Sequence, residues 1–196
     1  MPHSDLKDKL INYFLKFAEL TQEEKQAIAD SANILEFKKG TVLLKQGQIS
    51  KEIYFVLKGC VREFYMIEGE EKTSNFFTEE QWVISLKSNT HKIPADHFYD
   101  CLEDCTLVVA DEEKYNPMYE AFPRFERISI DILQHEFAVQ QDMQATYVTN
   151  SAEQRYLNLL KNRPDLLQRV PQYQLASFIG VKPETLSRIR RRLAAK

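Results

Sequence analysis

The 196-residue sequence has no hydrophobic run long enough to span a membrane, and its first residues, MPHSDLKDKL, contain no apolar core of a signal peptide. Cysteine is scarce, with Cys60, Cys101 and Cys105 only, and no Cys-x-x-Cys pair occurs. This spacing argues against a disulfide framework, a zinc site and an iron–sulfur cluster. We therefore expect a cytoplasmic protein that binds no membrane, metal or cofactor. Its thiols are expected to be small buried hydrophobic groups.

Glycine is also scarce, and four of the five glycines fall within one region, at Gly40, Gly47, Gly59 and Gly69. This region, Ile34 to Val109, is rich in β-branched and aromatic residues, as in EIYFVLKGCVREFYMI. Short strands separated by glycine turns predict an antiparallel β-roll or jelly roll. Histidine is absent from Ile34 to Val83, which argues against a cupin-like metalloenzyme, because such a site needs several histidines and carboxylates that converge in the barrel.

Helices are predicted on both sides of this region. Residues 4–17 carry apolar residues at helical spacing, and Thr21 with Glu24 forms a capping box that starts a helix to about Ala32. After Pro123, neither glycine nor proline occurs until beyond Arg163. Apolar residues recur in this stretch at helical spacing, including Ile128, Ile132, Val139 and Met143.

A helix of this length cannot bury its apolar stripe against a small β domain alone. We therefore expect residues 124–148 to pack against the same helix of a second copy, with Ile128, Ile132, Val139 and Met143 in the contact. Burial of the stripe against its own domain is the alternative interpretation.

Charge is distributed unevenly along the chain, whose net charge is -3. Residues 151–196 contain ten basic and three acidic residues, so they carry +7 while residues 1–150 carry -10. A basic surface can replace the counterions condensed on nucleic-acid phosphates. A solvated basic tail explains the same asymmetry.

The apolar spacing in QLASFIGVKPETLSRIRRRL, Gln174 to Leu193, favours nucleic-acid contact. A helix-turn-helix needs a small residue where its helices cross, a turn residue that tolerates positive φ, and apolar residues on the inner face of the second helix. These positions are filled by Ala176, Gly180, Leu186 and Ile189. Pro183 suits the first turn of the second helix. An amphipathic terminal helix with a basic outer face is the alternative.

Together these features resemble the Crp/Fnr transcription regulators over nearly the whole chain. FKKGTVLLKQGQISKEIYFVLKGCVREFY resembles their roll, and QLASFIGVKPETLSRIRRRL resembles their helix-turn-helix. The resemblance implies an α+β protein with an N-terminal β-roll of the cyclic-nucleotide-binding type over residues 1–123. A dimerisation helix over residues 124–148 and a winged helix-turn-helix domain over residues 149–196 would follow.

The resemblance also implies roles for individual residues. Glu184, Ser187 and Arg188 match the E-x-x-S-R pattern of the Fnr branch and would contact bases. The cyclic-AMP receptor branch has a further Arg before that Glu, where this sequence has Pro183. The residues expected to contact DNA phosphates are Lys182, Thr185, Arg190, Arg191 and Arg192.

The effector region departs from the family pattern. Members that bind cyclic nucleotides hold the ribose with a Glu after a Gly, and the phosphate with an Arg before Ser or Thr. The corresponding stretch here, TEEQWVISLKSNTHKIPADHFYDCLEDCTLVV, lacks both glycine and arginine. Asp96 and His97 fall near the phosphate-binding pair, and an aspartate would repel a phosphate. An effector pocket for another small molecule is a further interpretation, and its lining residues would be Phe64, Trp82, Asp96, His97 and Phe98; core filling by these aromatics is the alternative.

We therefore expect a homodimeric, sequence-specific DNA-binding transcription regulator that is no enzyme and is not controlled by cyclic AMP. Its expected partners are double-stranded DNA and a second copy of the chain, with RNA polymerase and an unknown small-molecule effector as further candidates. A Crp-type regulator that responds to cyclic AMP or another ligand is the first alternative. A cupin-like metalloenzyme and a ligand-binding module without DNA binding are alternatives from other classes.

Overall fold

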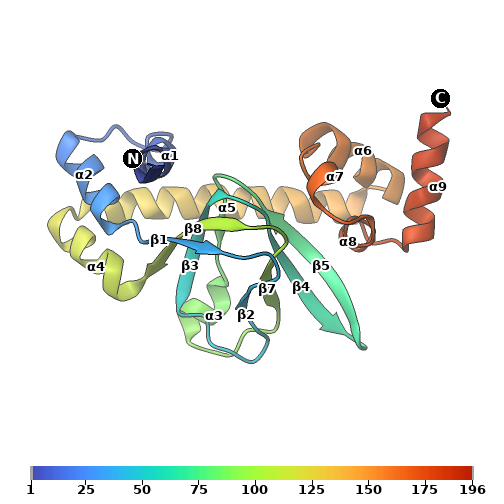
Figure 1. The fold of residues 1–196 in the computed structure, drawn as a ribbon, viewed down its shortest axis with the longest axis horizontal. Coiled ribbons are helices and arrows are strands. Elements are labelled where there is room, and N and C mark those ends of the chain that lie inside the picture. The colour runs from blue at the N-terminus through green and yellow to red at the C-terminus, as the bar shows by residue number, and fades with distance from the viewer. Residues whose placement is uncertain (1, 196) are drawn as a thin grey trace.

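The computed structural model describes residues 2–195, apart from the side chains of residues 2–4 and 112–114. The chain begins with two helices, α1 (Pro2–Phe14) and α2 (Gln22–Ser31). The strands are β1 (Ile34–Phe37), β2 (Val42–Leu44), β3 (Glu52–Lys58), β4 (Val61–Ile67), β5 (Glu70–Phe77), β6 (Trp82–Val83), β7 (Phe98–Cys101) and β8 (Cys105–Asp111), with helix α3 (Leu86–His91) before β7. The remaining elements are α4 (Glu112–Ala121), α5 (Arg124–Thr149), α6 (Ala152–Asn162), α7 (Leu166–Arg169), α8 (Gln172–Phe178) and α9 (Pro183–Ala194). Figure 1 shows α5 running along the molecule behind the strands, with α2 and α4 at one end and α9 at the other.

The strands form two antiparallel sheets, in the orders β1-β8-β3-β6 and β2-β7-β4-β5. Side chains from both sheets form one interior core, which includes Val56, Val61, Tyr99 and Leu107. The predicted antiparallel roll is therefore confirmed. Its turns follow the glycines, all of which have positive φ.

Gly59, between β3 and β4, is required for a second reason. A Cβ added there would lie 2.8 Å from the Cα of Cys105, so only glycine allows this close approach between strands. All three cysteines are buried.

Helices α1, α2 and α5 cover the outer face of the β1-β8-β3-β6 sheet. The apolar core beneath them includes Leu10 and Phe14 of α1, Ile28 of α2, and Phe125 and Ile128 of α5. The start of α2 is fixed by the predicted capping box: the backbone N–H of Glu24 donates to the Thr21 hydroxyl, and the Glu24 carboxylate accepts from the N–H of Thr21.

Helix α5 is a single helix of 26 residues that ends at Thr149, with Asn150 as its C-cap. A second capping box, between Ser151 and Gln154, starts α6 immediately afterwards and turns the chain away from the α5 axis. Across residues 2–195, no helix combines the length and the apolar character that a membrane span requires.

The C-terminal segment of the described chain is wholly helical. The connection from α6 to α8 contains α7, of four residues, and only Ala195 follows α9 among the described residues. No strand occurs after β8 within residues 2–195. The described residues therefore contain no wing of the expected winged helix-turn-helix, because α7 rather than a hairpin occupies the connection from α6 to α8.

Candidate nucleic-acid interface

Helices α8 and α9 and the turn between them form a helix-turn-helix over a small apolar core. Ala176 of α8 is fully buried, and Leu186 and Ile189 of α9 are buried against the same cluster. The backbone N–H of Val181 donates to the carbonyl of Ala176 at 2.9 Å and closes the turn. Pro183 occupies the first turn of α9, and the side chain of Lys182 makes no capping hydrogen bond.

Gly180 in this turn has a φ of +73°, a backbone angle that residues with a side chain rarely adopt. A Cβ at this position would also collide with the hydroxyl of Tyr147, near the end of α5. The positive φ is what requires glycine here, because the Tyr147 side chain is exposed and its hydroxyl end can shift.

The outer face of α9 carries the residues that the sequence assigned to base contact. Glu184, Ser187 and Arg188 are exposed on this face. Glu184 lies in the first turn, where a carboxylate interacts favourably with the helix dipole. Arg188 donates a hydrogen bond to Thr185 at 3.4 Å, and Thr185 is half-buried.

The basic residues assigned to phosphate contact differ in their surroundings. Lys182, Arg190 and Arg191 are exposed. Arg192, in contrast, forms an ion pair with Glu153 of α6. Its charge is therefore partly neutralised within the chain, which weakens its assignment as a phosphate contact.

Arg155 of α6 ties the helix-turn-helix to the end of α5. Its guanidinium donates to the carbonyls of Tyr147 at 3.0 Å, Asn150 at 2.7 Å and Ile179 at 2.9 Å. It also lies over the Tyr147 ring, 4.6 Å from the ring centroid. One side chain thus connects the long helix, the bend after it and the turn before α9. No local sequence pattern indicates this role for Arg155.

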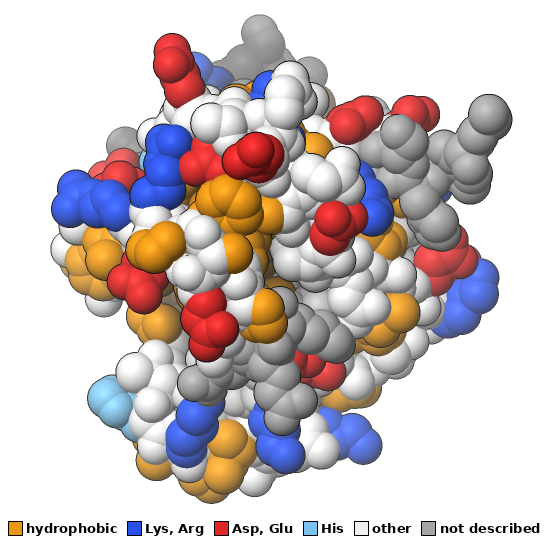
Figure 2. Space-filling view, turned by 90° about the vertical axis from the view of Figure 1, so that its left-hand side faces the viewer, with side chains coloured by type: hydrophobic (Ala, Val, Ile, Leu, Met, Phe, Trp, Pro, Cys, Tyr) orange, Lys and Arg blue, Asp and Glu red, His pale blue; other side chains and the backbone are white. Residues whose placement is uncertain are grey.

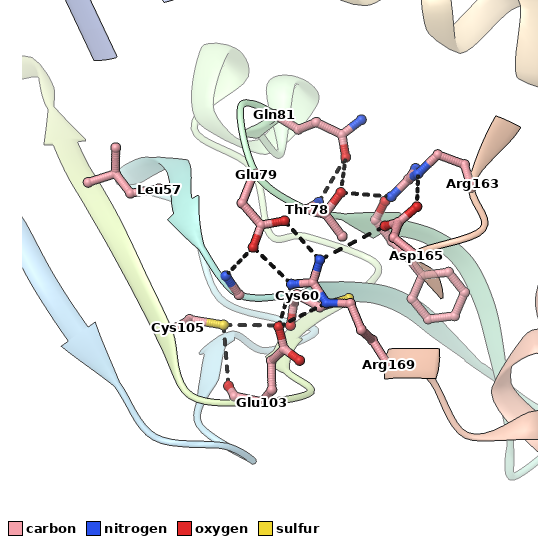
Figure 3. Close-up of polar contacts among 12 residues, drawn as sticks. Leu57, Cys60, Thr78, Glu79, Gln81, Glu103, Cys105, Arg163, Asp165 and Arg169 are labelled. Atoms are coloured by element: carbon pink, nitrogen blue, oxygen red, sulfur yellow. Dashed lines mark hydrogen bonds and ion pairs between the residues drawn. The ribbon is translucent and has the colours of Figure 1, made fainter. Parts of the chain in front are cut away.

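A second arginine, Arg169 at the end of α7, holds the C-terminal helices against the roll (Figure 3). It donates to Glu79 at 2.8 and 3.0 Å and to Glu103 at 3.1 Å through Nε. Glu79 also accepts the backbone N–H of Gly59 at 2.9 Å. Burial alone would raise the pKa of Glu79, but the hydrogen bonds from Arg169 and Gly59 keep this pKa below its usual value. We call Arg169, Glu79 and Glu103 the arginine latch.

Apolar contacts accompany the arginine latch. Phe76 of β5 is fully buried, and its ring packs edge-on against Phe178 of α8 with 5.2 Å between centroids. The backbone N–H of Thr73 donates to the Ser177 hydroxyl across the same contact at 2.9 Å. Burial raises the pKa of the nearby Cys60 thiol to about 12, so this thiol is a packing group rather than a reactive one.

Two of the four residues predicted to contact a second copy lie in the protein's own core. Ile128 and Ile132 are 4% and 7% exposed and pack under α1 with Phe125. Their prediction as dimer residues is wrong, because α1 already covers that face of α5. Val139 is exposed and Met143 is half-buried. Three large apolar side chains before Val139 on α5 are exposed: Ile130, Leu133 and Phe137.

The predicted effector pocket does not form as one site, because its five residues lie in three places. Trp82 packs outside the roll against Phe55, with 5.0 Å between ring centroids. Phe64 and Phe98 stack at 4.8 Å, and the Arg62 guanidinium lies over Phe64. Phe98 faces away from the interior core that contains Tyr99, because successive strand residues alternate between faces.

Asp96 and His97 do lie together, between α3 and β7. His97 is buried, and its Nδ1 is 2.9 Å from a carboxylate oxygen of the exposed Asp96. Its Nε2 is 3.8 Å from the carboxylate of Glu63, whose pKa is raised by burial. The two carboxylates beside His97 make this place unfavourable for a phosphate. Among the described residues, no group of three or more His, Cys, Asp or Glu side chains is arranged to hold a metal.

Comparisons with known proteins agree with this architecture. The family model of the cyclic nucleotide-binding domain matches residues 34–122. No curated protein matches the chain in sequence.

Solved structures match over most of the chain at low identity. The c-di-GMP responsive global regulator CLP of Xanthomonas campestris has a TM-score of 0.68 and 15% identity, covering 89% of this chain and 92% of that one. FixK2 of Bradyrhizobium japonicum has a TM-score of 0.66 and 14% identity, covering 84% and 85%. A CooA mutant of Carboxydothermus hydrogenoformans has a TM-score of 0.63 and 16% identity, covering 92% and 82%. These neighbours are transcription regulators, and with a cyclic nucleotide-binding-type roll followed by a helix-turn-helix, this chain has the fold of the Crp/Fnr regulators.

Proposed function

We propose that the protein is a sequence-specific DNA-binding transcription regulator, not an enzyme, that acts as a homodimer. The observation that carries the proposal is the outer face of α9, where Glu184, Ser187 and Arg188 are exposed above the buried Leu186 and Ile189. The positive charge of residues 151–196 supports phosphate contact around this face. Because such a regulator must reach its DNA, we propose that it is cytoplasmic. RNA polymerase is a further proposed partner.

In the proposed complex, α9 enters the major groove. The Arg188 guanidinium offers two parallel donors to a guanine edge, and Glu184 accepts from a cytosine amine. Lys182, Arg190 and Arg191 would contact phosphates and hold the helix in place without selecting a sequence. Two such helices in one dimer would bind half-sites about 34 Å apart.

For the dimer contact we propose Ile130, Leu133 and Phe137 in place of the buried pair. These residues are spaced three and four apart, as in the apolar seam of a coiled coil. All three are exposed in the single chain. Pairing of two α5 helices along this face would remove them from water. Val139 and Met143 lie on the side of the helix that carries Ile132, so they would not take part in this contact.

We propose that cyclic AMP is not the effector. Asp96 and Glu63 flank the buried His97 at the place that corresponds to phosphate binding. A cyclic phosphodiester there would face two carboxylates and no arginine, so electrostatic repulsion would oppose its binding.

Selection of bound sequences from random duplexes tests the proposed function. The unaltered protein should enrich a two-fold symmetric sequence, and Arg188→Ala should relax one base position in each half. Arg127→Ala, which alters an exposed arginine of α5 that pairs with Asp131 on its own helix, is the matched control and should keep the full motif. Enrichment of no motif by the unaltered protein would contradict the proposal.

A further inference from the structure

A cavity of about 220 Å³ lies outside the roll, between the β1-β8-β3-β6 sheet and helices α1, α2, α4 and α5. Its wall includes buried side chains from four elements, Phe14, Ile28, Val108 and Ile132. Leu86 and Leu133 line the cavity and are exposed, so they lie at its rim. Figure 2 looks onto this end of the molecule and shows hydrophobic side chains gathered in the middle of the face, with Asp and Glu side chains beside them.

Because its rim is exposed, the cavity is a pocket open to solvent rather than an enclosed void. Apolar cavities of about 150 Å³ stay dry and take up benzene. This one therefore has room for a molecule of about nine non-hydrogen atoms.

The polar groups around the cavity restrict the chemistry of what it accepts. The hydroxyls of Ser129 and Tyr119 are 2.8 Å apart and satisfy one another. Glu136 accepts the hydroxyl of Tyr13 on one carboxylate oxygen at 2.8 Å, and its second oxygen has capacity for another donor. Among the described lining residues, Glu136 alone carries a charge. An anionic molecule would be repelled, whereas a hydrogen-bond donor would be bound.

From these observations we infer that the cavity binds an uncharged apolar molecule with one hydrogen-bond donor, which Glu136 accepts. The site is separate from the roll interior that the family fold uses for nucleotides, and the inference does not depend on DNA binding. Its occupant would touch Ile132, Leu133 and Glu136 of α5 directly.

Titration of the full chain with 1-octanol tests the inference. Trp82 lines the cavity and is the only tryptophan in the sequence, so its emission reports on the site. We expect a saturable change in emission with 1-octanol, and binding of octanoate, which has the same chain length, at least about tenfold weaker because its charge would be buried beside Glu136.

Two variants separate this site from non-specific effects of the alcohol. Ala110→Leu fills part of the cavity and should abolish the saturable change while unfolding stays cooperative. Glu136→Gln keeps an acceptor for Tyr13 but removes the charge, so the affinity for octanoate should approach that for 1-octanol.

The inference fails if the emission change is linear with 1-octanol, if octanoate binds the unaltered protein as tightly as 1-octanol, or if a folded Ala110→Leu variant retains full affinity. If Ala110→Leu does not fold, the Glu136→Gln variant tests the inference instead. The ratio of the affinities for 1-octanol and octanoate should change in this variant, and an unchanged ratio would exclude Glu136 from the site.

Discussion

Removal of the Arg169 side chain should loosen the contact between the helix-turn-helix and the roll. In the arginine latch, Arg169 makes four hydrogen bonds to Glu79 and Glu103. Both carboxylates are about a third exposed, with side-chain exposures of 38% and 34%. Because solvent partly screens both ion pairs, we give each of them the stabilisation of a strong surface ion pair, about 1 kcal/mol. We expect Arg169→Ala to shift the docking equilibrium by about 2 kcal/mol, which is roughly 30-fold.

The backbone amide of Thr73 reports on this equilibrium, because it donates to Ser177 across the contact. In Arg169→Ala its hydrogen exchange, measured by NMR, should become roughly 30-fold faster. The amide of Ala95, which donates to Gln48 within the roll, should exchange as before. Arg127→Ala is the matched control and should change neither rate.

The reciprocal variant removes the same interaction from the other side. The double substitution Glu79→Gln and Glu103→Gln leaves α7 unchanged and keeps an acceptor for the N–H of Gly59. It should accelerate exchange at Thr73 to a similar extent. Unchanged exchange at Thr73 in both variants would refute the assignment of Arg169 as a latch.

The latch also has a defined pH dependence. The pKa of Glu79 is lower in the folded protein than in an unfolded chain, where it is about 4.3. Its contribution to stability is therefore fully present above that unfolded-state value and is lost as the pH falls through the lower folded-state value. Exchange at Thr73 should stay constant between about pH 5 and pH 8 after correction for intrinsic rates, and accelerate only in stronger acid.

Three further outcomes are expected. Phe137→Glu, at a site 60% exposed, should give monomers by light scattering with little change in thermal unfolding, whereas Ile132→Glu should destabilise the fold by several kcal/mol, because it buries an unpaired charge. Arg188→Ala should cost about 1 to 3 kcal/mol at the selected DNA site, and Arg191→Ala should lower the salt slope of binding by about one unit, with a smaller effect for Arg192→Ala because Glu153 pairs with Arg192. Cyclic AMP should give no binding heat in calorimetry at micromolar concentrations; a saturable heat would contradict the electrostatic argument.

Local sequence signals predicted the element boundaries well. The Thr21–Glu24 capping box, the turn glycines and Pro183 in the first turn of α9 each depend on residues within a few positions of one another. Their conformations are set by short-range sterics and hydrogen bonds, which remain the same in any fold that contains them.

The partners of apolar residues were harder to predict. Helical spacing identified Ile128 and Ile132 as one face of α5, but it does not say whether α1 or a second copy covers that face. The prediction that the effector residues form one pocket was wrong for another reason. Phe98 is adjacent on its strand to Tyr99, which lies in the interior core, so strand alternation points Phe98 away from that interior.

No sequence pattern predicted the contacts that join the C-terminal helices to the roll and to the end of α5. Arg169 and Glu79 are separated by 90 positions, and Arg155 bonds to backbone carbonyls, which any residue supplies. Such contacts depend on the tertiary arrangement, and a single sequence contains no periodicity that reports them.

Two restraints act on the same helix-turn-helix from different directions. Arg155 fixes the turn before α9 to the end of α5, while Arg169 fixes α7 to the roll. Rotation of α5 relative to the roll cannot satisfy both, because the first restraint moves with α5 and the second with the strands. The two restraints differ in kind: Arg169 makes partly solvent-screened ion pairs with two carboxylates, whereas Arg155 makes three hydrogen bonds to backbone carbonyls and an additional ring contact. A rotation of α5, whose residues Glu136 and Leu133 line the cavity, would therefore have to break one of these two sets of contacts.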